Sequence, residues 1–388
     1  MARGFSKIGA TLALSVMLCA AGDTPDYAAA ARALDALVEQ GYAYPEKLPG
    51  GVLPRSAKLD AERAAVHDSR SLLHYAEDRI TSLADHHAIT GSSFKDSWAV
   101  IPTYADVWVV ARDGRFVIDA VREGSPAAQA GIRAGDVLAA VDGIETGAAV
   151  ASFWDALGLA VTPHRADYAA RVLAAGRRDR ERRLTITSAG GASRTLTLPS
   201  LYTFQSDRPP LSVEHAGKQT VIRFNNSLGD DGTIAAFDAA MAQVPAGDRL
   251  VLDLRDTPSG GNTTIARAVM GWFVSKPHSY QMHNRPVEQR ETGIARQWIE
   301  QVLPRNGKFR KRLPAVWVGR WTGSMGEGLA IGFAAMGAPV RGTPMAGLNG
   351  SVEDLEIEGT GLSIKLPTER LSTITGVPRE DFVPQPLH

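Results

Sequence analysis

The spacing of apolar residues divides the chain into three parts. In the first part, residues 24–88, apolar positions recur every three or four residues over segments 27–40 and 58–84, which predicts amphipathic helices. Segment 44–54 between them is rich in proline and glycine and is predicted to be a loop. We therefore expect a small helical N-terminal domain over residues 22–97.

In the second part, residues 98–200, strand-like segments at 107–110 and 115–121 and a glycine-linked hairpin at 184–198 replace the helical spacing. The stretch GSPAAQAGIRAGDVLAAVDG, residues 124–143, lies between them. Its turn residues fall where tight turns need them, and they are Gly131, Gly135, Asp136 and Gly143.

This stretch resembles a PDZ domain, and the resemblance implies a PDZ-like domain over residues 98–200. A PDZ groove binds an extended peptide by strand addition and holds its terminal carboxylate on backbone N–H groups. Residues 148–181 have a helical pattern and are expected to supply the helix beside that groove.

In the third part, residues 201–388, segments of strand and helix character alternate after a proline-rich linker at 206–210. The strands are expected at 220–226, 249–256 and 315–320, and the helices at 232–244, 261–274 and 328–337. This alternation predicts an α/β domain with an interior sheet. Two glycine turns, PSGG (258–261) and TGSMGEG (322–328), follow strands, where such domains build their sites.

Composition and the N-terminus narrow the class of protein. The 42 basic and 42 acidic residues balance, which argues against nucleic acid as a partner. Residues 1–21 combine Arg3 and Lys7 with a short apolar run and small residues, which predicts a signal peptide and an exported, periplasmic or secreted protein. Cys19 is the single cysteine and leaves a lipid-anchored form as an alternative; without it the mature chain has no thiolate for a metal or for catalysis.

Ser324 in TGSMGEG is the candidate nucleophile. A serine nucleophile needs a base for its proton and N–H donors for the oxyanion. Because Ser324 opens a helix, its own N–H and that of Met325 are candidate donors, and Gly260 and Gly261 can supply a second set.

The ordered set of helical segment, PDZ-like module, DLRDTPSGGNTT (253–264) and TGSMGEG resembles the tail-specific, or C-terminal-processing, serine peptidases and their tricorn-like relatives. The resemblance implies a multidomain α/β fold. Its parts are a crotonase-like α/β peptidase core over residues 201–388, an inserted or preceding PDZ-like domain and the helical N-terminal domain. It also implies a peptide or unfolded-protein substrate, no cofactor and no metal. The family's Ser-x-x-Glu element corresponds to Ser324 and Glu327.

The identity of the catalytic base depends on which branch of the family the chain resembles. One branch uses a lysine about 25 residues after the serine, but Leu348 or Asn349 stands there and the next lysine is Lys365. The tricorn-like branch takes a histidine from an Asp-x-His stretch, which implies His87 as the base and His86 as the fallback. A histidine base predicts an activity limb near pH 6.5, within about one unit. A metal site from the two histidines is disfavoured because adjacent side chains do not converge on one ion.

The acid that orients the histidine stays open between Glu353 and Glu380, whereas Glu327 is expected to fix the turn. His86 also replaces a serine of the tricorn-like pattern. These departures leave a second hypothesis, a catalytically inactive binding protein that uses the PDZ groove and the core as a ligand site. A trypsin-like protease and an α/β-hydrolase fit less well, since neither the domain order nor Thr322 matches their patterns.

Overall fold

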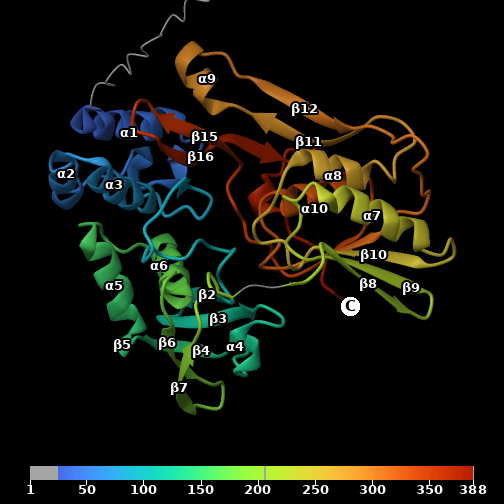
Figure 1. Cartoon of the computed structure of the whole chain (residues 1–388), viewed down its shortest axis with the longest axis horizontal. Helices are drawn as coiled ribbons and strands as arrows, with labels where there is room; N and C mark the ends of the chain where they lie inside the picture. Colours follow the sequence, from blue (N-terminus) through green and yellow to red (C-terminus); the bar gives the residue numbers. More distant parts are fainter. Residues whose placement is uncertain (1–24, 205–206, 388) are drawn as a thin grey trace, which may run out of the picture.

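The computed structural model describes residues 25–204 and 207–387, so the predicted signal peptide lies outside the described residues. Figure 1 shows three regions: a helical region with the hairpin β15–β16, the PDZ-like region below it, and a larger α/β core beside both. In the described part of the chain, no helix has the length and apolar character needed to cross a membrane.

The N-terminal region contains three helices, α1 (Tyr27–Gly41), α2 (Ala57–Ala64) and α3 (Ser69–Thr81), with short 3-10 turns η1 (Pro45–Lys47) and η2 (Pro49–Gly51). The predicted helix over 58–84 is interrupted, because Asp68 forms a capping box with Ser71 and starts a new helix. These helices bury their apolar faces against the hairpin β15 (Ser351–Ile357) and β16 (Leu362–Ser372) in one shared core.

The PDZ-like region is a six-stranded sheet with the order β2-β3-β4-β6-β7, in which β5 pairs with β4. Its strands are β2 (Val107–Arg112), β3 (Arg115–Val121), β4 (Val137–Val141), β5 (Ile144–Glu145), β6 (Arg182–Thr187) and β7 (Ser193–Leu198). Its helices are α4 (Pro126–Gln129), α5 (Thr146–Ala156) and α6 (Pro163–Ala175), so the helical prediction over 148–181 is interrupted after Ala156 and ends at Ala175.

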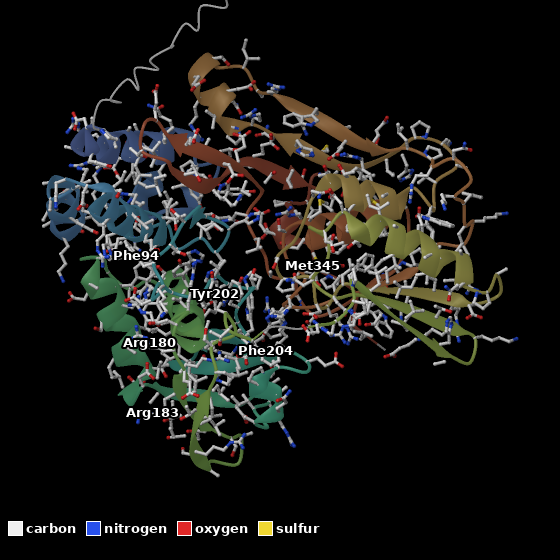
Figure 2. The ribbon with its side chains drawn as sticks, in the orientation of Figure 1. Phe94, Arg180, Arg183, Tyr202, Phe204 and Met345 are labelled. Atoms are coloured by element: carbon white, nitrogen blue, oxygen red, sulfur yellow. The ribbon has the colours of Figure 1, made fainter. Side chains whose placement is uncertain are left out.

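Tyr202 and Phe204, which Figure 2 labels, follow the last strand of the PDZ-like region. Each side chain is 47% exposed, and the Tyr202 ring lies 4.9 Å from that of Tyr104. Phe204 and Tyr104 line a cleft of about 520 Å³ together with Arg122, Asn226 and Ser259.

The core is a sheet with the order β14-β13-β10-β9-β8, parallel except for β8 at its edge. Its strands are β8 (Leu211–Ala216), β9 (Gln219–Phe224), β10 (Arg249–Asp253), β13 (Ala315–Val318) and β14 (Val340–Gly342). Helices α7 (Gly232–Gln243), α8 (Thr263–Met270) and α10 (Met325–Ala335) pack on it around fully buried residues such as Leu252 and Val316. The predicted interior sheet is confirmed.

A second sheet combines a short strand from the N-terminal part of the chain with strands from the C-terminal part. Strand β16 pairs with β1 (Ile89–Thr90), β15 and β11 (His278–Asn284), and β11 pairs with β12 (Gln297–Val302). Helix α9 (Pro286–Thr292) connects β11 to β12, and the turn η3 (Arg379–Asp381) follows β16. Because β1 begins two residues after His87, this pairing brings the histidine loop to the C-terminal half of the chain.

Candidate active site

Ser324 lies at the start of helix α10, after the turn that follows strand β13. Its backbone has φ 49° and ψ −112°, a conformation that residues with side chains rarely adopt. Thr322 fixes the turn, because its hydroxyl donates to the Leu254 carbonyl and accepts the N–H of Gly319. The turn therefore holds Ser324 at the carboxyl end of the parallel sheet.

Glu327 is fully buried beneath this turn. Its carboxylate accepts the N–H groups of Ser324 (2.9 Å), Gly347 (2.9 Å) and Leu348 (3.2 Å). Burial raises the pKa of Glu327 to about 7, although Arg379 and the three N–H donors oppose the shift. The hydrogen bonds agree with the prediction that Glu327 fixes the turn. They also correct one expectation, because the Ser324 N–H is already used and does not face an oxyanion.

His87 faces the serine hydroxyl. Its Nε2 lies 3.0 Å from Ser324 Oγ, and its Nδ1 lies 2.6 Å from the Asn349 carbonyl oxygen. A carbonyl only accepts hydrogen bonds, so in the neutral ring Nδ1 carries the hydrogen. Nε2 is then the basic nitrogen and accepts the hydrogen bond from Ser324.

A buried carboxylate, Asp85, holds the surroundings of this histidine. Its Oδ1 accepts the backbone N–H of His87, and its Oδ2 accepts the Tyr42 hydroxyl and the Asn349 side-chain amide, each at 2.8 Å. Asp85 thus connects the histidine loop to the residue whose carbonyl orients the ring. In the sequence, Tyr42 and Asn349 carry no signal for these roles, and Asp85 carries one only as the aspartate of the Asp-x-His stretch.

The imidazole of His87 is kept neutral. Burial, assisted by the Arg379 guanidinium, lowers the pKa of His87 from 6.5 to about 4, although the Asn349 carbonyl and Asp85 oppose the shift. At neutral pH the ring is therefore available as a proton acceptor.

Neither predicted acid contacts the histidine. Glu353 on β15 pairs with Arg285 (3.0 Å), and Glu380 on η3 pairs with Lys47 (3.2 Å). The orienting acceptor of His87 is a backbone carbonyl instead, which corrects the prediction that one of the two glutamates holds the ring.

The fallback base and the alternative lysine both lie away from the serine hydroxyl. His86 stacks on Tyr168 with the ring centroids 4.4 Å apart and makes no hydrogen bond to Ser324. Lys365 pairs with Asp354 on the two-stranded hairpin β15–β16, and both side chains are well exposed.

Gly260 lies directly against the nucleophile. Its φ is +65°, and a Cβ at this position would lie 2.5 Å from Ser324 Cβ and 3.0 Å from the Met325 nitrogen. Its N–H donates to the Thr257 carbonyl at 3.1 Å. Gly260 therefore allows close approach, but its N–H is used within the turn, which corrects its assignment as an oxyanion donor.

The N–H groups of Gly261 and Met325 donate to no acceptor within residues 25–204 and 207–387. Asn226 holds the glycine turn that contains Ser259. Its N–H donates to the Asp256 carbonyl, its side-chain oxygen accepts the Ser259 N–H, and its side-chain NH2 donates to the Ser259 hydroxyl, the last two at 2.9 Å. Met325 directly follows Ser324 and Gly261 directly follows Gly260, so these two N–H groups are the candidate donors for a developing negative charge.

Two groups on the free edge of strand β2 in the PDZ-like domain are already bonded. Asp167 of α6 accepts the Ala111 N–H at 2.7 Å, and Arg171 of α6 donates to the Val109 carbonyl at 3.0 Å. A peptide adding to this edge would compete with both bonds.

Within the described residues, no group of His, Cys, Asp and Glu side chains is arranged to hold a metal ion.

The comparisons with known proteins agree with this architecture. Residues 117–152 match the family model described as a PDZ domain. The solved structure of the photosystem II D1 C-terminal processing protease is similar with a TM-score of 0.57 and 17% identity, covering 94% of each chain. Mature CPAF complexed with lactacystin is similar with a TM-score of 0.55 and 15% identity, covering 92% of this chain and 93% of that chain. Comparison with the sequences of curated proteins gives no match.

The chain therefore has the mixed α/β fold of C-terminal processing proteases and carries a PDZ domain. At these identities the similarity concerns the fold. It supports the predicted resemblance to the tail-specific peptidases over nearly the whole described chain.

Proposed function

We propose that this chain is an exported serine endopeptidase that cleaves peptides or unfolded protein tails, with Ser324 as nucleophile and His87 as base. The observation that carries the proposal is the 3.0 Å contact between Ser324 Oγ and the Nε2 of a neutral histidine whose Nδ1 is bonded to a carbonyl. This arrangement also favours the enzyme over the inactive binding protein, which would need no serine–histidine contact.

The proposed reaction uses side chains and backbone alone. As Ser324 Oγ attacks the peptide carbonyl carbon, its proton passes to His87 Nε2, and the N–H groups of Gly261 and Met325 stabilise the oxyanion. The imidazolium is stabilised by the Asn349 carbonyl and by nearby Asp85. His87 then protonates the leaving amine as the C–N bond breaks, and later takes a proton from the water that hydrolyses the acyl-serine ester.

Substrate binding is proposed for two places. The cleft of about 520 Å³ is lined by Ser259, the residue before Gly260, and is proposed to hold the part of the unfolded chain that lies beside the scissile bond. The PDZ domain is proposed to hold the substrate terminus by strand addition at β2. Binding there would displace the bonds that Asp167 and Arg171 make to the β2 backbone.

A fluorophosphonate probe tests the proposed activity on the purified protein. The expected result is one covalent adduct, located on Ser324 by peptide mass spectrometry and lost after prior heat unfolding. Absence of an adduct, with unaltered binding of unfolded peptides, would favour the binding-protein hypothesis instead.

Export is proposed from the charged start and short apolar run of residues 1–21. The expected mature chain begins near Gly22. Intact-mass measurement of protein from a cell-envelope or secreted fraction checks this; a mass that includes Met1 to Ala21 contradicts it, and a diacylated Cys19 indicates lipid anchoring.

The pH profile is expected to differ from that of an ordinary histidine. Activity requires neutral His87, so kcat/KM should rise with pH through the folded pKa of about 4 rather than near 6.5. The charged groups that face the ring are Arg379 and Asp85, and Glu327 lies beneath Ser324. Initial rates from pH 3.5 to 9 on an uncharged peptide check this.

Glu327 is the second group beside the serine that titrates in this range, because its pKa is about 7. A limb near pH 7 that disappears in Glu327→Gln belongs to Glu327, whereas the limb near 4 should persist in that variant. A single limb near pH 6.5 in both proteins would contradict the lowered pKa of His87.

A further inference from the structure

Helix α6 is fixed to strand β2 by its charged side chains. Besides their bonds to the β2 backbone, Asp167 and Arg171 pair with each other at 3.2 Å. The Arg171 guanidinium also lies over the ring of fully buried Trp108, 4.5 Å from its centroid. These contacts join α6 to the sheet. The helix can therefore support a neighbouring segment that packs against its other face.

The remaining face of α6 touches the loop that carries the proposed base. His164 Nε2 lies 3.0 Å from the Ala84 carbonyl oxygen and donates to it. One turn later, the buried ring of Tyr168 stacks on His86 with an interplanar angle of 13°. Ala84 itself has φ +53°, so the loop begins at a residue in a conformation that alanine rarely adopts.

We propose that His164 and Tyr168 are positioning residues, which hold the loop Ala84–His87 so that the His87 ring meets the Ser324 hydroxyl. This inference rests on the proposed function. It assigns the PDZ-like domain a second role, in which one of its helices completes the active site of the adjacent core.

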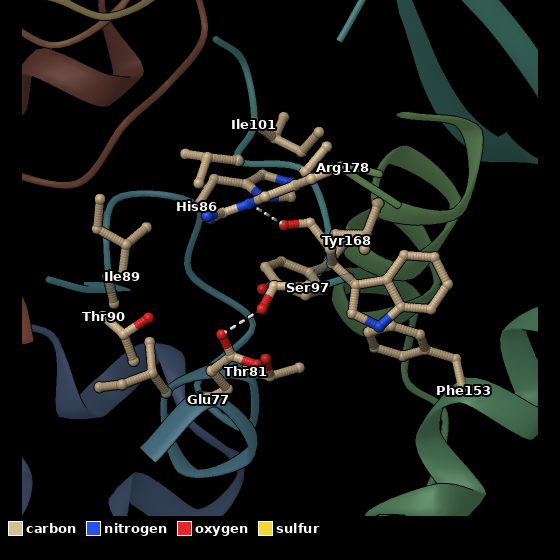
Figure 3. A pocket seen from close by; sticks show the side chains of 16 residues that line it. Glu77, Thr81, His86, Ile89, Thr90, Ser97, Ile101, Phe153, Tyr168 and Arg178 are labelled. Atoms are coloured by element: carbon tan, nitrogen blue, oxygen red, sulfur yellow. Dashed lines mark hydrogen bonds between the residues drawn. The ribbon is translucent and has the colours of Figure 1, made fainter. Parts of the chain in front are cut away.

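A cavity lies beside His86, so the loop that carries His86 needs support at this position. Figure 3 shows His86 and Tyr168 lining a cavity of about 80 Å³ together with Ser97 and Phe153, and neither Ser324 nor His87 lines it. The His86 Nε2 atom has no hydrogen-bond partner within residues 25–204 and 207–387. Without the stacked tyrosine, the His86 ring is free to move into this cavity, and the loop can shift with it.

Such a shift would change catalysis more than folding. A displacement of about 1 Å in a catalytic group can lower a rate on the order of a hundredfold. Asp85 still holds one side of the loop through the His87 N–H, so a smaller loss is expected here.

The test compares four variants of the full chain by peptide hydrolysis and by the rate of fluorophosphonate labelling. His164→Ala removes the bond to Ala84 at an exposed position, where folding should be unaffected. Tyr168→Leu removes the stacked ring, and Tyr168→Phe retains it. The matched control is His67→Ala, another exposed histidine whose ring bonds a backbone carbonyl, that of Ala65, in the turn between α2 and α3.

The expected result is a loss in kcat of about tenfold for His164→Ala and Tyr168→Leu, with KM unchanged, and wild-type behaviour for Tyr168→Phe and His67→Ala. The acid limb should also move from about 4 toward 6.5 in the two impaired variants, because water reaches a loosened His87. Among the described residues, the titratable or charged groups around the loop include His86, His164, Arg171, Asp85, Arg379, Tyr42 and Tyr168.

A merely structural role for α6 would lower the melting temperature without moving the acid limb, and that outcome overturns the inference. Wild-type rates and pH profile in His164→Ala and Tyr168→Leu overturn it as well. Failure of the proposed function looks different, because then the wild-type protein itself does not label at Ser324.

Discussion

Ser324→Ala and His87→Ala are each expected to lower kcat for hydrolysis of an unstructured peptide by about 10³-fold or more, with little change in KM. The serine oxygen forms the bond to the substrate, and the histidine removes its proton, so each acts only when the other is present. The double variant should therefore be no slower than either single variant. Steady-state kinetics and circular dichroism on the three proteins check this.

Two control variants distinguish His87 from the other residues considered as the base, Lys365 and His86. Lys365→Ala should retain wild-type activity, because this exposed lysine pairs with Asp354 away from the serine. His86→Ala should lose far less activity than His87→Ala, since His86 contacts Tyr168 rather than the nucleophile. Near-complete loss in Lys365→Ala or His86→Ala, together with substantial activity in His87→Ala, would contradict the proposed mechanism.

The parts of the fold that the sequence predicts are those with local periodicity. The helix at Tyr27–Gly41, the strand at Arg115–Val121 and the α/β alternation all follow from apolar spacing. Strands β11 and β12 were not predicted. Gln297–Val302 mixes polar and apolar residues and leaves Ile299 exposed, and β11 pairs with β16, which lies far away in sequence. The packing of the N-terminal helices on β15 and β16 has the same long-range origin.

The candidate site shows the same division between local and long-range information. Ser324, Glu327 and His87 lie in short recognisable patterns, whereas the carbonyl of Asn349 that orients His87 carries no side-chain signature at all. Likewise, no pattern tells which N–H of a glycine turn is used internally, so Gly260 and Gly261 were not distinguished. Charge spacing could not identify the partners of Glu353 and Glu380, because Arg285 and Lys47 are distant in sequence.

Gly260→Ala is expected to lower kcat by about a hundredfold or more. An added Cβ would lie 2.5 Å from Ser324 Cβ and 3.0 Å from both Ser324 Oγ and the Met325 nitrogen. Either the serine or the turn must then move, which separates the hydroxyl from His87 and turns the oxyanion donors away from the substrate. Peptide kinetics and the fluorophosphonate labelling rate measure the loss.

Gly217→Ala is the matched control, because Gly217 has φ +58°, close to the +65° of Gly260, and a Cβ there would meet nothing within 4 Å. Both substitutions place alanine in the left-handed region and should each destabilise the fold by about 1–2 kcal/mol. Only Gly260→Ala adds a clash with the nucleophile, so its melting temperature should fall at least as far as that of Gly217→Ala, and only its activity should be lost. Equal activity in the two variants would show that the approach of Gly260 to Ser324 does not matter for the reaction, and the proposed arrangement of Gly261 and Met325 around the oxyanion would then be wrong.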